Sequence, residues 1–463
     1  MRWTRTIAAL PVVLIFAGCT PDAAPTDPGV AAPLAERGGL PHYDAAAALN
    51  AVNAGNQHAY DVSPSLVPPG APLAPFVEAR LYAIAYIAMH DALNAINPRF
   101  ERYADNGPID RSANPAVAVL TAARDGIVGA NPGAQSATDA WYAEEMSALG
   151  AAEGVDEGIA VGHRVAAAIL ARRATDGTAG GGVAPYTPGT HAGDYQFTFP
   201  FNTPDFNFFG TGGFADASMW GTVVTPFVLT SGAQFRAPRP YGASSNADAV
   251  LTDQYTRDYN EIKSLGCLDC ADRTDEQTEI ALFWAESSSS GWNRVARSFA
   301  AARNMDAWQA ARLYALVEIG IFDSYTTSLE SKYYYNFWRP ESAVALAGND
   351  GNPATSSATG WGVLLFPTPP VPDYPSAHAE VGATAGTVMD ALVPGTGRPF
   401  VQSSMTRPGV TRTFTTIDSA IRENGLSRIY IGYHFRTAVD VGIAQGRLMG
   451  QYIARNALRP IRP

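Results

Sequence analysis

Residues 76–96 constrain the fold more than any other part of this sequence. They end in Ala-Met-His-Asp-Ala-Leu-Asn-Ala-Ile and carry apolar residues on nearly all sides when wound into a helix. Such a helix has no polar face to turn to water, so we expect it at the centre of the protein. Strand-like alternation is scarce elsewhere, and alanine is frequent, which suits close helix packing. We therefore predict an all-α fold.

Helical periodicity marks six further stretches of the chain. They cover roughly 114–130, 136–173, 275–303, 306–332, 377–393 and 413–456. Two long irregular stretches rich in glycine and proline, 175–250 and 343–375, interrupt them. Irregular segments of this length inside a folded domain are usually functional or cover something.

The first residues, 1–19, have the pattern of an export signal. An apolar core at 7–17 follows two arginines and is too short to span a bilayer. Phe-Ala-Gly-Cys at 16–19 resembles a bacterial lipobox, which would make Cys19 a lipid-modified N-terminus; ordinary cleavage and full release is the alternative. Residues 20–45 have the composition of a flexible linker. We expect an exported protein, either a periplasmic or outer-membrane lipoprotein or secreted, without a membrane-spanning segment.

Composition and charge exclude several classes of partner. The chain has 463 residues, 46% of them hydrophobic and only 16% charged, which is the composition of a globular protein. Its net charge of -11 argues against a nucleic-acid surface and against adhesion to anionic lipid. A basic pocket in this chain must therefore be local.

Two cysteines, Cys267 and Cys270, lie in Gly-Cys-Leu-Asp-Cys. A zinc site would need a second pair of ligands, and a thioredoxin-like motif would need a βαβ context that the sequence does not indicate. In an oxidising compartment we expect a local disulfide with a structural role.

Lys332 and Arg339 open the first of three short polar blocks, in Lys-Tyr-Tyr-Tyr-Asn-Phe-Trp-Arg-Pro. Residues seven apart share one face of a helix, about 10 Å apart along its axis. Pro340 would end that helix and leave Arg339 at its final turn, where a guanidinium can grip two oxygens. Taken alone, the pair reads as two surface cations.

Pro375-Ser376-Ala377-His378 opens the next helical stretch. Ser376 can cap that helix, and the free N–H groups of a first turn bind anions. His378 would stand beside the bound group as a proton donor or acceptor. Taken alone, the block reads as a capping serine beside a solvated histidine.

The third block is Ser427-Arg428, followed six residues later by His434. Six residues is not a helical repeat, so one regular helix would not align the two side chains, whereas a bend near Gly432 would. A histidine in this apolar, aromatic neighbourhood must find a partner. Together the blocks hold three cations, two histidines and a serine, a set suited to one tetrahedral oxyanion.

The order Lys-x6-Arg-Pro, Pro-Ser-x-His and Ser-Arg-x5-His resembles the three-part signature of the vanadium-dependent haloperoxidases and the related type 2 phosphatidic-acid phosphatase superfamily. Residues 323–340, 226–236 and 273–281 also resemble stretches of bacterial haloperoxidase homologues. The resemblance runs from about residue 48 to the C-terminus. It implies two helical bundles, about 46–250 and 270–463, in one catalytic domain with the oxyanion site between helices.

The resemblance also implies roles for the cations and the donors. Lys332, Arg339 and Arg428 would neutralise the equatorial oxygens of vanadate, or of phosphate in the same site. Ser376 and the N–H of Ala377 would add hydrogen bonds.

Each histidine has two implied roles. His434 would bind vanadium through a ring nitrogen, and His378 would assist peroxide activation. In the phosphatase version of this pocket, His434 becomes the nucleophile and His378 the general acid.

Four positions depart from the family pattern. Ala377 replaces the usual glycine, and Ala438 replaces an aspartate often found four residues after the second histidine, with Asp440 two further on. Leu329 and Val371 stand where a tryptophan and a phenylalanine or histidine are typical. Both of these positions line the halide side, so the oxyanion pocket is better supported than chlorination.

Two aspartates lie in apolar helices, where a carboxylate is costly unless it is paired. We expect Asp323 to be an outer partner that orients a pocket cation or His378, and Asp440 to play that part for His434. A helix-to-helix bond to Arg80 or a backbone group is the alternative for Asp323. For Asp91 both interpretations stay open.

Three functional hypotheses follow. The first is a vanadate-dependent peroxidase that uses hydrogen peroxide to oxidise a halide, bromide or iodide rather than chloride, and then halogenates or oxidises a small organic compound. The second is a phosphatase on the same pocket. The third is a non-catalytic oxyanion-binding surface protein. Large helical surfaces are compatible with a homodimer.

Overall fold

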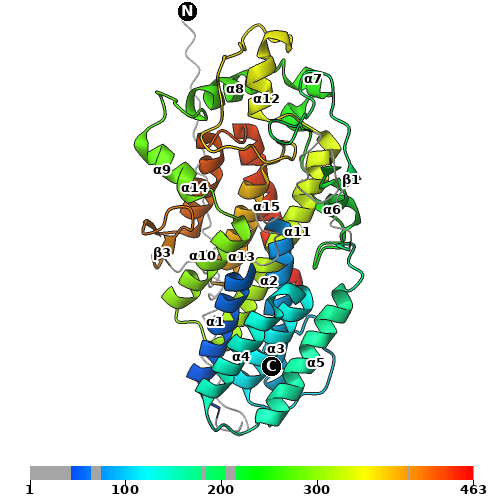
Figure 1. Ribbon diagram of the computed structural model, residues 1–463, viewed down its shortest axis with the longest axis vertical. Helices are drawn as coiled ribbons and strands as arrows, with labels where there is room; N and C mark the ends of the chain where they lie inside the picture. Colours follow the sequence, from blue (N-terminus) through cyan, green and yellow to red (C-terminus); the bar gives the residue numbers. More distant parts are fainter. Residues whose placement is uncertain (1–42, 64–74, 180–183, 204–214, 394–396, 462–463) are drawn as a thin grey trace, which may run out of the picture. The chain divides into compact units, whose positions relative to one another are not determined.

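The computed structural model describes residues 43–63, 75–179, 184–203, 215–393 and 397–461 (Figure 1). Within these residues helices predominate, and the sheets are two antiparallel pairs of short strands. The all-α prediction is confirmed. The expected export signal with Cys19, and most of the expected linker, lie outside the described residues.

The N-terminal helices pack around α2. They are α1 Ala45–Val62, α2 Pro75–Ile96, α3 Pro115–Ala130, α4 Gln135–Leu149 and α5 Val155–Arg173. Helix α2 is buried along almost its whole length and packs against α1, α3, α5 and α11 (Ala307–Tyr335). Small residues permit the close approach, because a Cβ placed on Gly126 of α3 would lie 3.2 Å from the Cα of Ala85. The central helix expected at 76–96 is therefore confirmed.

One predicted helix, 136–173, is divided in the structure. Helix α4 ends at Leu149, α5 begins at Val155, and Gly150 and Gly154 between them have φ angles of 64° and 70°. Glycine adopts a positive φ at little cost, and such a residue ends a right-handed helix. The apolar periodicity resumes after the break, so the pattern alone did not reveal it.

Between α5 and α11 the chain forms short elements and three longer helices. Their bounds are β1 Ala184–Pro185, β2 Ala215–Asp216, α6 Ser218–Val223, α7 Asn246–Ala249, α8 Asp253–Leu265, α9 Asp275–Phe283 and α10 Ser288–Ala302, with 3-10 turns at Gly232–Phe235 and Pro240–Gly242. The helix predicted at 275–303 is thus two helices. Helices α1 and α8 were not anticipated as separate elements.

The C-terminal part holds the helices that carry the polar blocks. After α11 come α12 Pro340–Leu346, α13 Ala377–Leu392, β3 Phe400–Ser403, β4 Thr411–Phe414, α14 Ile417–Tyr430 and α15 Arg436–Asn456. The helix predicted at 413–456 is therefore the end of a strand and two helices. Helix α13 packs against α11, α14 and α15, and α11 also packs against α2, so α11 joins the N-terminal and C-terminal helices (Figure 1).

The two larger apolar cores among the described residues result from this packing. The larger lies among α1 to α5, α10, α11 and α13, and the second gathers around α8, α12 and the segment 429–439. The described residues from 43 onwards belong to one compact unit. Across the ranges given above, no helix is both long and apolar enough to cross a membrane.

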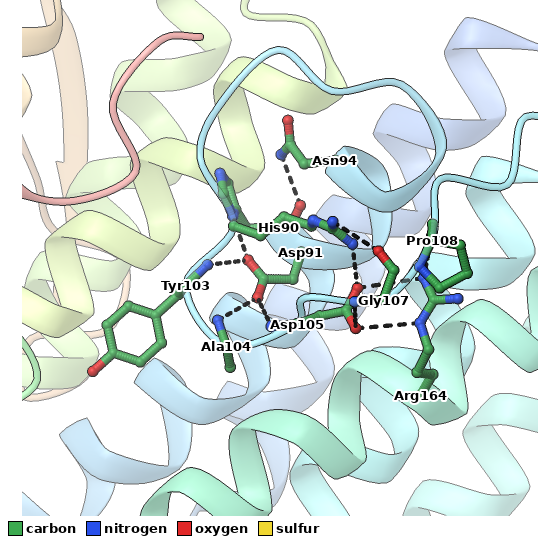
Figure 2. A network of polar contacts seen from close by, with 10 residues as sticks. His90, Asp91, Asn94, Tyr103, Ala104, Asp105, Gly107, Pro108 and Arg164 are labelled. Carbon is green, nitrogen blue, oxygen red and sulfur yellow. Dashed lines mark hydrogen bonds and ion pairs between the residues drawn. The ribbon is translucent and has the colours of Figure 1, made fainter.

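Asp91, whose role the sequence left open, holds a loop beside the end of α2 (Figure 2). Its carboxylate accepts the backbone N–H groups of Tyr103 at 2.8 Å, Ala104 at 2.8 Å and Asp105 at 3.2 Å. The ring Nδ1 of His90 lies 3.0 Å from the same carboxylate. Backbone donors satisfy this buried charge, so Asp91 is a structural residue remote from the three polar blocks.

Candidate anion-binding active site

Lys332 and Arg339 do not share one helix, and that prediction was wrong. Helix α11 ends at Tyr335, and Asn336 follows with a φ angle of 55° and an N–H that binds the Lys332 carbonyl at 2.7 Å. Arg339 then has extended backbone as the residue before α12. Pro340 disfavours helical angles at Arg339, and the left-handed Asn336 has already ended the helix.

Both side chains still bind carbonyl groups of the same segment, residues 371–373. The ammonium of Lys332 donates to the carbonyls of Pro372 at 2.6 Å and Asp373 at 2.9 Å. The Nε of Arg339 donates to the carbonyl of Val371 at 2.7 Å. Lys332 has three N–H bonds, so one stays available for a further acceptor.

Ser376 stands at the start of α13 without capping it. Its side chain makes no capping bond, its N–H donates to the Ala438 carbonyl at 2.9 Å, and its buried Oγ has no partner among the described residues. The interpretation as a plain capping serine is therefore wrong. As the first residue of α13, Ala377 has an N–H that no carbonyl within the helix can accept.

His378, in the first turn of α13, turns one ring nitrogen to a protein partner and leaves the other without one. Its Nδ1 lies 2.7 Å from the hydroxyl of Ser288, and its buried Nε2 has no partner within the described part of the chain. Burial, with the charge of Arg428 adding to it, holds the pKa of His378 well below its ordinary value. His378 is therefore neutral at neutral pH before an anion binds.

Arg428 and His434 are brought together by the bend at Gly432. The N–H groups of Tyr433 and His434 both bind the Arg428 carbonyl, at 3.1 and 3.2 Å, and Gly432 has a φ angle of 91°. A Cβ on Gly432 would meet the Gly266 carbonyl oxygen at 2.3 Å. Only glycine combines this φ angle with this close approach.

Gly432→Ala is expected to destabilise the fold by about 2–4 kcal/mol, because a positive φ and a backbone clash coincide. Gly409→Ala is the matched control, since Gly409 has a φ of 84° and nothing lies within 4 Å of an added Cβ. Chemical denaturation of both variants measures the difference. Equal losses of stability would show that the contact with Gly266 does not matter.

The loop that carries Gly266 also carries the two cysteines. Cys267 and Cys270 form a disulfide with a Cα–Cα distance of 5.1 Å. Leu364 donates its N–H to the Gly266 and Ile431 carbonyls, at 3.1 Å each. The cross-linked turn thus supports the bend that positions His434, and its role is structural.

Asp373 is the carboxylate that orients His434, and the sequence analysis missed it. Its Oδ1 lies 2.9 Å from His434 Nδ1, and both side chains are buried. Burial raises the pKa of Asp373 to about 7, against the lowering effects of Arg339 and Lys332. Asp440, which the sequence analysis predicted to orient His434, is instead exposed on α15 beside Arg436. Asp440 points to solvent because it lies six residues beyond His434, on the outer face of α15.

The prediction that Asp323 orients a pocket cation or His378 was also wrong. Its carboxylate accepts the N–H groups of Phe227, Val228 and Leu229 at 2.5, 2.8 and 2.9 Å. Burial raises its pKa to about 6, and these three donors oppose that shift. Asp323 therefore ties the 227–229 loop to α11, which is the backbone alternative that the sequence had left in second place.

The electrostatics show that the three blocks converge on His434. Burial lowers the pKa of His434 well below its ordinary value, and Arg339, Lys332, Arg428 and His378 lower it further, in that order. The Nη1 of Arg339 lies 3.0 Å from His434 Nε2. Coulombic interaction weakens with distance, so Lys332 of α11, Arg339 before α12, His378 of α13 and Arg428 of α14 lie near one imidazole.

Arg428 is the least satisfied of the cations. Its side chain is 5% exposed, and its Nε and Nη1 have no partner among the described residues. Its guanidinium lies 4.9 Å from the ring centre of Tyr433. Burial lowers its pKa to about 10, so it stays charged at neutral pH.

The donors of this pocket fit a tetrahedral oxyanion. Buried donors without partners point to a missing acceptor, because a native protein rarely leaves such groups unsatisfied. Here they belong to Arg428 and Ser376, beside the third N–H of Lys332, and the Nε2 of His378 is a further buried polar atom without a partner among the described residues. An anion would also relieve the repulsion among three buried cations. The described residues contain no group of three or more His, Cys, Asp or Glu side chains that could hold a metal cation.

The chain is similar to known proteins in sequence and in fold. Residues 312–463 match the family model of the VCPO second helical-bundle domain. The vanadium chloroperoxidase of Curvularia inaequalis is 27% identical over 42% of this chain, and the match spans 42% of that relative's own length.

Solved structures match over more of the chain. A bacterial structure described as the first vanadium-dependent iodoperoxidase superimposes with a TM-score of 0.72 and 22% identity, covering 89% of this chain and 97% of its own. A holo-type bacterial vanadium-dependent chloroperoxidase gives a TM-score of 0.64 at 17% identity, covering 84% and 93%. These matches show a shared fold.

Proposed function

From the membership of residues 312–463 in the VCPO second-bundle family and from the pocket around His434, we infer that this chain is a vanadate-dependent haloperoxidase. It would use hydrogen peroxide to oxidise bromide or iodide, and the oxidised halogen would react with a small organic compound. The observation that carries the proposal is the set of buried, unpartnered donors facing a neutral His434.

Each residue of the pocket has a part in holding the anion. Lys332, Arg339 and Arg428 balance its negative charge, and Ser376 Oγ and the Ala377 N–H donate hydrogen bonds to its oxygens. Bonds to backbone carbonyls hold Lys332 and Arg339 in place, and all of these groups are buried. Bound vanadate would supply a Lewis-acidic centre that activates hydrogen peroxide without changing its oxidation state.

His434 is prepared as a ligand by Asp373. An ionised carboxylate only accepts, so it holds the single ring proton of a neutral imidazole on Nδ1. The lone pair of Nε2 then faces the pocket and can bind the metal. His378, near Arg428, holds a proton that can pass to or from an oxygen of the bound group.

The preference for bromide or iodide rests on two replaced positions. Leu329 is buried in the main core, and Val371 contributes its carbonyl to Arg339. Neither adds a polar or aromatic side chain to the halide side. Chloride is the hardest of the three halides to oxidise, and one neighbour in structure is described as an iodoperoxidase.

Purified protein loaded with orthovanadate should brominate a phenol-type dye with peroxide, and His434→Ala should lower that rate by at least about 1000-fold, because the ligand to the metal is lost. His163→Ala is the matched control, since His163 is exposed on α5 and remote from the pocket. The measurement is the bromide-dependent initial rate for each variant.

Other outcomes would favour the rival hypotheses. Phosphate-ester cleavage without any vanadate-dependent oxidation, together with labelled phosphohistidine at His434 on rapid quench, would identify a phosphatase. Tight binding of vanadate and phosphate without turnover in either assay would identify an oxyanion-binding protein.

We also propose that the protein is exported, with Cys19 as the lipid-anchored N-terminus. The disulfide of Cys267 and Cys270 supports an oxidising compartment. Mass spectrometry of the mature N-terminus from the native host distinguishes a lipid-modified Cys19 from simple cleavage.

A further inference from the structure

Ser288 is a pocket residue to which the proposed function has not yet given a role. It is the first residue of α10, is 2% exposed, and places its Oγ 2.7 Å from His378 Nδ1. Tyr325 of α11 lies close enough to both Ser288 and Arg428 for each to lower its pKa. Tyr325, Ser288 and His378 therefore lie in a row, in which the Oγ of Ser288 contacts the Nδ1 of the imidazole.

We propose that Ser288 is a positioning residue that keeps the ring proton of His378 on Nε2, so that His378 donates a hydrogen bond into the anion site while His434 presents a lone pair to it. This inference rests on the proposed function. It assigns opposite tautomers to the two histidines of one pocket. The tautomer of His434 is set by its contact with Asp373, and that of His378 by its contact with Ser288.

The difference between the two partners follows from their chemistry. Asp373, behind His434, is an acceptor when ionised, so it keeps a proton on the Nδ1 that faces it. A serine hydroxyl can donate as well as accept. Donation from Ser288 to His378 Nδ1 requires a lone pair on that nitrogen, which leaves the proton of a neutral ring on Nε2.

Tyr325 favours donation by Ser288. Burial raises the pKa of Tyr325 far above neutral, so its hydroxyl keeps its proton. When that hydroxyl donates to Ser288 Oγ, the proton of Ser288 is directed at His378.

An anion bound in the pocket also favours a proton on Nε2 of His378. His378 Nε2 is buried without a partner among the described residues, and an oxyanion beside it offers lone pairs. A lone pair on Nε2 would repel the anion, whereas an Nε2–H would bind it. The contact at Nδ1 and the anion at Nε2 therefore favour the same tautomer of His378, with its proton on Nε2.

Neighbouring serines supply controls. The hydroxyls of Ser287 and Ser290 donate to Glu78, and that of Ser289 donates to the Pro75 carbonyl at 2.9 Å. Ser288 alone of this run of four contacts His378. Ser289→Ala therefore removes a buried hydroxyl from the same turn without touching the pocket.

The first test is the tautomer itself, measured without vanadate, halide or turnover. Nitrogen-15 spectra of histidine-labelled protein at pH 8, with the signals of His378 assigned from His378→Asn, should show a protonated Nε2 and an unprotonated Nδ1. Ser288→Asp, which places a carboxylate behind the ring, should move the proton to Nδ1. A wild-type spectrum with the proton of His378 on Nδ1 would overturn the proposal.

The second test uses a pair of variants matched in shape. Ser288→Thr keeps the hydroxyl and should bind orthovanadate as wild type does, whereas Ser288→Val should bind it about tenfold more weakly, the effect of one buried hydrogen bond. Ser289→Ala should bind as wild type. Equal dissociation constants for the Thr and Val variants, by titration calorimetry, would overturn the proposal. If wild type shows the expected tautomer but no vanadate-dependent oxidation, the proposed function fails and the tautomer assignment does not.

Discussion

Asp373→Asn is expected to lower vanadate-dependent bromination at pH 8 by about 10³-fold or more, the scale seen when a carboxylate that sets a histidine tautomer becomes an amide. At that pH, above the raised pKa of about 7, Asp373 is ionised and accepts the Nδ1 proton of His434. An asparagine amide can donate to Nδ1 instead, which would put the ring proton on Nε2. His434 would then have no lone pair for the metal.

Asp440→Asn is the matched control for this experiment. Sequence position alone made Asp440 the candidate partner of His434, whereas the structure leaves it exposed. Its variant should keep the wild-type rate within a factor of about two, as expected of a surface change. A large loss in Asp440→Asn with little loss in Asp373→Asn would refute the arrangement around His434.

Arg428→Met is expected to stabilise the anion-free protein by about 1–3 kcal/mol while weakening orthovanadate binding by about 100-fold. The guanidinium is buried, two of its nitrogens have no partner among the described residues, and it repels Lys332 and Arg339. Methionine fills similar volume without a charge. The substitution should therefore weaken anion binding and raise the free energy of unfolding together, a trade-off common at functional sites.

Calorimetric melting with and without orthophosphate measures both effects. Wild type should melt higher with the anion, because a ligand that binds the folded state alone stabilises it, and Arg428→Met should show a higher melting temperature and a much smaller shift. Arg436→Met is the control, since that arginine pairs with Glu261 and its removal should not stabilise. A lower melting temperature for Arg428→Met without anion would contradict the assignment.

Much of the architecture follows from periodicity. The helices expected at 76–96, 114–130 and 377–393 lie within a residue of their predicted positions. Errors arose where glycine or proline chemistry interrupts a continuing pattern, as at Gly150 and Gly154. The path of Arg339 was also wrong, because a left-handed Asn336 ends α11 before the arginine is reached.

The candidate site divides in the same way. Spacing and residue type in the sequence indicated the cations, both histidines, Ser376 and the need for a bend at Gly432. Nothing local marked Ser288, which reads as one serine in a run of four. Asp373 carried a weak signal, as an acidic residue three positions before Ser376.

The sequence by itself indicated most of the helical segments and the cations, histidines and Ser376 of the pocket, because helix periodicity and motif spacing are local properties. Only the tertiary structure decided which side chain contacts the Nδ1 of each histidine. Asp373 and His434 are 61 residues apart, and Ser288 and His378 are 90 apart. Such pairs form when helices pack, and their geometry depends on every turn between them, so a carboxylate at one ring and a hydroxyl at the other become visible only in the fold.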